Sequence, residues 1–212
     1  MIKHIRALVT RFRRSEEAVA AVEFALIVPF LITLYLGSIE AASLFTVDKR
    51  VNSLSATMGD LVAQWDPEEE GTLTTADLNS YMAAATGILA PYSSTGVQIV
   101  VSFVKVSKAA TEGDGGTTNV LWSKANAAGT KKSAGQPYDD LTLTSEMNKL
   151  LAKSGGCVVA AEVKYSYTPI LGQVFNAAIT MTHTNYFLPR YGNTTPIQMQ
   201  GEATVDSKAC TT

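Results

Sequence analysis

The sequence predicts an α+β fold in which one long N-terminal helix and a shorter helix precede several β-strands. Three observations carry this prediction. A membrane-length apolar stretch continues without a break into an amphipathic helical pattern, and a second helical pattern with capping residues follows it. The later part of the chain contains runs that are rich in β-branched residues or that alternate in polarity. We expect these runs to form an antiparallel sheet.

The first predicted helix extends from about Val19 to Gln64. Its first part is apolar over residues 18–39, and a helix that spans a bilayer needs about 20 mostly apolar residues. Its second part is amphipathic, with one apolar face that we expect to pack on a soluble domain. This apolar face consists of Leu44, Val47, Val51, Leu54, Met58, Leu61 and Trp65. The opposite, polar face consists of Asp48, Lys49, Arg50, Asn52, Ser53 and Asp60.

The charges before the apolar stretch predict its orientation. Five basic residues precede it, against Glu16 and Glu17. They are Lys3, Arg6, Arg11, Arg13 and Arg14. Because positive charge stays in the cytoplasm, we expect a cytoplasmic N-terminus and export of everything after about residue 45. The same basic arm is suited to anionic lipid.

A cleaved secretory signal peptide is the competing interpretation of this stretch. Ala41-Ala42-Ser43 provides small residues for a cleavage site, but the helical pattern continues through Ala41 without a break. Glu40 also occupies the position where the apolar core of a signal peptide should end.

Glu23 is the anomalous residue of the apolar stretch. A carboxylate within a membrane segment costs a few kcal/mol or more, so such a residue usually has a partner or a function. The alternative is an acid at the membrane edge that reaches water.

The remainder, residues 66–212, is of ordinary size for one hydrophobic core. Thr74 and Asp77 provide N-cap residues for a helix over about 76–89, with Leu78, Met82, Ala85 and Leu89 on one face. Strands are predicted over 97–106, 119–122, 157–168 and 178–188, a short helix over 144–152, a turn over 112–116 and a surface loop over 125–138.

Two cysteines, Cys157 and Cys210, follow the apolar stretch and would meet an oxidising compartment. A disulfide between them would tie the C-terminal tail to a central strand and contribute roughly 4 kcal/mol in the chain-entropy model. Two free thiols are the alternative. His4 and His183 would lie on opposite sides of the membrane, and we expect His183 to be a satisfied sheet residue rather than a metal ligand.

The acidic segment Asp66–Asp77 fits the twelve-position frame of a calcium loop. Asp66, Glu68 and Glu70 would take positions 1, 3 and 5, Gly71 would make the turn, and Thr72 would offer its carbonyl. Long Glu residues at positions 3 and 5, and Asp at position 12, argue against it. The alternative is a solvated connector whose Thr and Asp residues cap the next helix.

Signals of catalysis and of nucleic-acid binding are poor. The sequence has no nucleophile-elbow, zinc-protease or phosphate-loop motif, and it indicates no cofactor or resident metal. The net charge is −2; the first 18 residues carry five basic and two acidic side chains, so the remainder has a net charge of −5. An acidic main domain is a poor candidate for nonspecific nucleic-acid binding.

Ala18-Val-Ala-Ala-Val-Glu-Phe24 resembles a prepilin-peptidase site, in which a small residue precedes four apolar residues and then Glu-Phe. The run from Ala21 to Phe30, with its Pro29, is similar to TadE-like minor pilins or pseudopilins of the tight-adherence (Flp/Tad, type IVb) pilus system. The closely matching part covers about residues 15–60. Shorter pieces at 59–64, 90–92, 120–123 and 186–190 also resemble that family.

The resemblance implies a pilin-like fold, with the long helix packed on the sheet of a head domain. It implies a leader over 1–18, a transmembrane and amphipathic helix over 19–65, and a periplasmic head over 66–212. Cleavage would follow Ala18 and expose Val19, so that Glu23, next to Phe24, becomes the fifth residue and pairs with the amine of a neighbouring subunit. Ala18 departs from the usual Gly, and related TadG-like proteins stay uncleaved.

The implied role is pilus assembly for surface adhesion, as a priming, capping or incorporated subunit. The implied partners are other pilin subunits, a prepilin peptidase, inner-membrane lipid and assembly-platform proteins. The implied location is the inner membrane or the extracellular pilus. Two alternatives remain open: a membrane-anchored periplasmic binding module, and an uncleaved structural component of the pilus machine.

Overall fold

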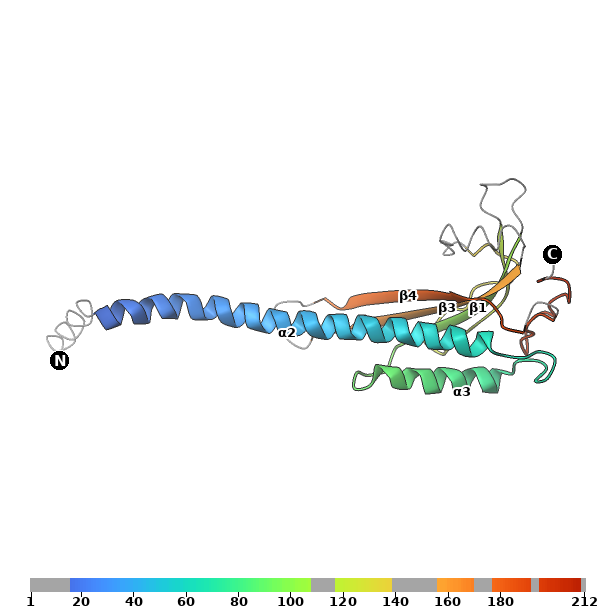
Figure 1. Ribbon diagram of the computed structural model, residues 1–212, viewed down its shortest axis with the longest axis horizontal. Coiled ribbons are helices and arrows are strands. Elements are labelled where there is room, and N and C mark those ends of the chain that lie inside the picture. Colours follow the sequence, from blue (N-terminus) through green and yellow to red (C-terminus); the bar gives the residue numbers. More distant parts are fainter. Residues whose placement is uncertain (1–15, 108–116, 139–155, 170–176, 192–194, 211–212) are drawn as a thin grey trace. The chain divides into compact units, whose positions relative to one another are not determined.

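The computed structural model describes residues 16–107, 117–138, 156–169, 177–191 and 195–210 (Figure 1). It confirms the predicted α+β fold, a long helix packed on a four-stranded antiparallel sheet. The elements are α2 (Glu16–Ala63), α3 (Thr75–Thr86), the 3₁₀ turn η1 (Gly87–Leu89), β1 (Gln98–Val106), β2 (Thr118–Ala125), β3 (Gly156–Tyr167) and β4 (Ile179–Phe187). The predicted helix over 144–152 and turn over 112–116 lie outside the described residues.

The chain divides into two compact units, with a boundary in α2 between Phe45 and Thr46. The second unit, which we call the head, contains α2 from Thr46 onward, α3 and all four strands. Its sheet has the order β2-β1-β3-β4, and every neighbouring pair is antiparallel. In Figure 1 the strands lie along the C-terminal part of α2.

Strand β2 is longer than the predicted 119–122. Lys124 and Ala125 pair with Val101 and Val100 of β1, and therefore the ladder continues beyond the apolar run. The register shifts between Phe103 and Val104, which accommodates one extra residue on β2. The composition of this segment alone does not predict the extension, because it depends on pairing with β1.

The core forms where the amphipathic part of α2 meets the sheet. Val47, Val51, Leu54 and Met58 are fully buried, as the helical spacing predicts. The next core position was predicted one residue early: Val62 is fully buried, whereas Leu61 is only half-buried. A step of four residues from Met58, close to the helical period of 3.6, brings Val62 onto the buried face.

One buried polar residue joins α2 to the middle of the sheet. The Ser55 hydroxyl is fully buried and donates a hydrogen bond to the Ala161 carbonyl of β3, at 2.6 Å. One turn further, Gly59 allows close approach, because a Cβ atom there would lie 2.4 Å from Cδ2 of Phe187 in β4. Together these small residues set how closely α2 approaches β3 and β4.

Helix α3 runs back along α2 (Figure 1). Thr74 and Asp77 form a capping box at its start, and Leu78, Met82, Ala85 and Leu89 are buried, as predicted. Just after the C-terminal end of α3, the carbonyls of Ile88, at 2.8 Å, and of Ala90 accept hydrogen bonds from Arg50 of α2. A cation at the carbonyl end of a helical turn is favourable, because orphan carbonyls and the helix dipole both attract it.

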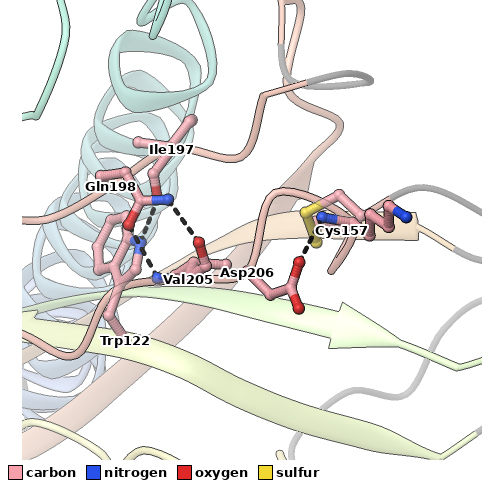
Figure 2. The surroundings of a disulfide bond; sticks show 8 residues. Trp122, Cys157, Ile197, Gln198, Val205 and Asp206 are labelled. Atoms are coloured by element: carbon pink, nitrogen blue, oxygen red, sulfur yellow. Dashed lines mark hydrogen bonds between the residues drawn. A yellow bond between two sulfur atoms is a disulfide. The ribbon is translucent and has the colours of Figure 1, made fainter.

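Residues 195–210, which we call the C-terminal strap, cross from the α2–α3 connection to the sheet. The strap exchanges backbone hydrogen bonds with Leu73, and the Trp122 indole N–H of β2 donates to the Ile197 carbonyl at 2.7 Å. The Gln198 amide closes a turn by bonding both the N–H and the carbonyl of Val205, each at 2.8 Å (Figure 2). Irregular backbone in the strap is thus satisfied by side chains.

Two further contacts fix the strap. A disulfide joins Cys210 to Cys157, near the start of β3, as the sequence predicts. Glu202 accepts hydrogen bonds from Lys124 and Lys131, each at 2.9 Å. Burial by itself would raise the pKa of Glu202, but the hydrogen bonds and charges of the two lysines outweigh it and lower that pKa below its usual value.

The close approach at Gly59 predicts that Gly59→Ala destabilises the head. The added methyl group forces the Phe187 ring to move, and such overpacking costs about 1–3 kcal/mol. The measurement is urea unfolding of the full chain in detergent micelles. Gly87→Ala is the matched control, because Gly87 has a helical backbone and open space at its Cβ position. An equal unfolding midpoint for Gly59→Ala and wild type would contradict the packing described.

The disulfide encloses a long loop, with a sequence separation of 53. We predict that Cys157→Ser combined with Cys210→Ser lowers the free energy of unfolding by about 4 kcal/mol, because the unfolded chain regains loop-closure entropy. Unfolding of the same micellar protein, followed by Trp fluorescence, measures the change. Treatment of wild type with a reductant should reproduce it, and an unchanged midpoint in both cases would show that the strap is held without the bridge.

Candidate functional site: the exposed apolar segment of α2

The first part of α2 exposes large apolar side chains in every direction. Among residues 19–39, which we call the apolar segment, Phe24 is 67% exposed, Leu26 74% and Phe30 67%. The most apolar 18-residue window of the helix is not buried at all. Such a surface needs a cover other than water, either lipid or other protein.

The apolar segment has the length and composition of a membrane-spanning helix. At about 1.5 Å per residue, it extends roughly 30 Å, which matches the hydrocarbon thickness of a bilayer. Its two aliphatic hydroxyl groups are satisfied within the helix: Thr33 donates to the Pro29 carbonyl at 2.8 Å, and Ser38 to the Tyr35 carbonyl at 2.7 Å. In an α-helix the Thr33 backbone N–H faces the same Pro29 carbonyl, so the hydroxyl shares this acceptor with the helical amide.

Glu23 is the one acidic residue in the apolar segment. The structure places it on the helix surface, exposed, between Val22 and Phe24. Among the described residues it makes no hydrogen bond or ion pair, so its carboxylate is available to a group outside this chain. Val19 is 54% exposed. Ala18 belongs to α2, but its side chain lies outside the described part of the chain.

Beyond the apolar segment, polar residues of α2 make specific contacts with β4. His183 Nε2 lies 2.6 Å from Asp48 Oδ1. The Asn185 amide donates to Asn52 Oδ1, at 3.0 Å, and to the Ser55 hydroxyl, at 3.2 Å. His183 is thus a satisfied sheet residue, as expected.

The polar face of this part of α2 was predicted as distinct from the packing face. The structure shows instead that several of its residues flank the buried stripe and bond to the rest of the head. Arg190 donates its backbone N–H to the Ala63 carbonyl at the end of α2, and its guanidinium lies 2.7 Å from Asp60 Oδ1. Helical periodicity cannot show this, because the partners of Asp48 and Asp60 follow more than 120 residues later.

The acidic connection between α2 and α3 does not gather the side chains of a calcium loop. Asp66 Oδ1 accepts hydrogen bonds from the backbone N–H groups of Glu68 and Glu69, and Asp77 belongs to the capping box. In the part of the chain that the structure describes, no group of three His, Cys, Asp or Glu residues is placed to hold a metal ion. Asp66 therefore serves turn formation, and Thr74 and Asp77 cap the next helix, as the alternative interpretation expected.

Residues 18–57 match the family model described as TadE-like protein. This part of the chain is similar to that family, and we call it the TadE-like segment. It contains Val19, Glu23 and the whole apolar segment, and it ends within the face of α2 that packs on the sheet. No curated protein and no solved structure matches the chain. The TadE-like segment thus coincides with the exposed apolar helix and its junction with the head.

Proposed function

We propose that this protein is a minor pilin or pseudopilin that takes part in assembly of a Tad (type IVb) pilus, by priming, capping or incorporation. The observation that carries the proposal is the TadE-like segment, because its residues are also those that leave a long apolar surface uncovered. The work of such a protein is interaction rather than catalysis. Its partners are other pilin subunits, the assembly platform and the lipid of the inner membrane.

The exposed side chains of the apolar segment support both environments that assembly requires. Before assembly, lipid covers them; in a filament, the apolar helices of neighbouring subunits cover them instead. The basic residues of the leader support an N-terminus in the cytoplasm and a periplasmic head. The disulfide of the head is consistent with an oxidising compartment on that side.

Glu23 has the central role in this proposal. A prepilin peptidase cuts after Ala18, and Val19 then carries a free amine. Glu23 of one subunit pairs with that amine on the next subunit, since a carboxylate in a low-dielectric layer is stabilised by a nearby cation. The exposure of Glu23 and the absence of a partner among the described residues support this pairing.

We predict that Glu23→Gln reduces surface pili to about a tenth of wild type or less. The amide keeps the shape of the side chain but loses the charge, and loss of one partner of a desolvated ion pair costs about 3–5 kcal/mol. The measurement is the amount of sheared pili from cells in which the variant replaces the wild-type copy. The amount of variant in the membrane fraction should remain unchanged.

Glu69→Gln is the matched control, because Glu69 is an exposed acid of the head and the substitution is chemically identical. It should leave both pili and membrane protein at wild-type amounts. Normal piliation with Glu23→Gln would sink the assembly role of Glu23 and favour the alternatives, a membrane-anchored periplasmic binding module or an uncleaved component of the pilus machine.

A further inference from the structure

A groove of about 280 Å³ lies between the strands β1 and β2 and the C-terminal strap. Lys105, Asn119 and Leu121 line the strand side. The strap side includes Thr204, Asp206 and Lys208, together with Ala203, Val205 and Ala209. None of these residues belongs to α2, so the groove is separate from the TadE-like segment and does not depend on the proposed function.

Both walls of the groove are fixed by contacts already described. Lys105 and Asn119 are paired across β1 and β2, and the register shift next to them leaves Leu121 as the extra residue. The strap is held on either side of its groove-lining residues by the bonds of Glu202 and by the disulfide at Cys210. A preformed groove of this kind binds a ligand without a large ordering cost.

Lys105 distinguishes this groove from the rest of the sheet surface. The other two half-buried lysines of the neighbourhood, Lys124 and Lys132, each pair with a carboxylate. Lys105 is also half-buried, yet among the described residues it has no hydrogen bond or ion pair. An ammonium group without a partner in its own chain favours an anionic ligand, since charge-assisted hydrogen bonds are the strong ones.

The remaining lining residues indicate what else the ligand carries. Asn119 and Thr204 can each donate and accept hydrogen bonds. One oxygen of Asp206 accepts from the Lys208 N–H at 2.8 Å, which leaves its other oxygen to accept a bond from a ligand (Figure 2). Asp206 would repel a bare anion, although Lys208 lines the same wall, whereas a ligand that also has hydroxyl groups would bond to Asp206.

We propose that the groove binds an acidic sugar, with the carboxylate at Lys105 and ring hydroxyls at Asn119, Thr204 and Asp206. The groove volume of about 280 Å³ suits one sugar ring, because pockets for drug-sized ligands have volumes of about 300 to 1,000 Å³. Leu121 offers an apolar surface for the ring face. An apolar ligand would leave the ammonium group of Lys105 unpaired.

Saturation-transfer NMR on the full chain in detergent micelles tests the proposal, with D-glucuronate as the probe and D-glucose as its neutral counterpart. Transfer to the ring protons is expected for glucuronate and at least about tenfold weaker for glucose, given the worth of a hydrogen bond to a charged group. Lys105→Gln should weaken glucuronate binding by a similar factor, and Lys105→Arg should retain it. Lys164→Gln, an exposed lysine of β3 outside the groove, is the matched control.

Equal transfer to glucose and glucuronate, or unchanged binding by Lys105→Gln, would overturn the proposal. Competition with inorganic phosphate tests the sugar part separately. Phosphate at an equal concentration should fail to displace glucuronate, and full displacement would identify a general anion site instead. The wild-type unfolding midpoint in Lys105→Gln would show that lost binding does not reflect lost folding.

Discussion

The rest of the structure depends on one helix that must satisfy two different surroundings. From Val19 to Ile39, α2 exposes large apolar side chains around its whole circumference. From Val47 onward, it buries one stripe against the sheet. Each Å² of apolar surface left in water costs roughly 25 cal/mol, so the first part requires lipid or protein around it, whereas the second part obtains its cover from its own chain.

The contact between α2 and the sheet also determines where the rest of the head lies. Ser55 and Gly59 bring the helix close to β3 and β4, while Asp48 and Asp60 pair with residues on or just after β4. Arg50 donates a hydrogen bond to the Ile88 carbonyl, which follows α3. The apolar stripe supplies most of the favourable free energy, and the flanking polar pairs, which are partly exposed, contribute mainly to register.

The C-terminal strap has a different role, because it is bonded to β2 and to the start of β3, whereas α2 approaches β3 and β4. The strap has almost no helix or strand structure, yet its residues Ile197 and Met199 are buried. Its position follows from a disulfide, an indole hydrogen bond and a half-buried carboxylate between two lysines. The groove at Lys105 is a consequence, since the strap forms one of its walls.

Local sequence was sufficient for the features that depend on neighbours along the chain. The continuity of α2, the cap at Thr74 and the buried face of α3 follow from periodicity and capping chemistry, although α2 begins at Glu16, three residues before the predicted start. Strand order and the pairs made by Asp48 and Asp60 depend on residues far away in sequence, and the length of β2 depends on its pairing with β1. The choice of Val62 over Leu61 shows the limit of periodicity, because both lie within one helical step of the buried stripe.

The composition of the apolar segment likewise indicates only part of its function. An exposed helix of this length indicates a membrane or a partner, and Glu23 within it indicates a specific use, but lipid anchoring and filament assembly place the same demands on the side chains. Cleavage of the chain after Ala18 distinguishes filament assembly from lipid anchoring. Removal of the leader creates the free amine that the assembly account requires, and a permanent anchor has no need of it.

The most direct test is the intact mass and N-terminal sequence of the protein from native membranes, with and without the prepilin peptidase. The account predicts a chain that begins at Val19 when the peptidase is present and at Met1 when it is absent. A chain that begins at Met1 in both cases would contradict the role of Glu23 as partner of a new amine. A start near Ala42 or Ser43 would contradict the account altogether, because the apolar segment would then be a discarded signal peptide.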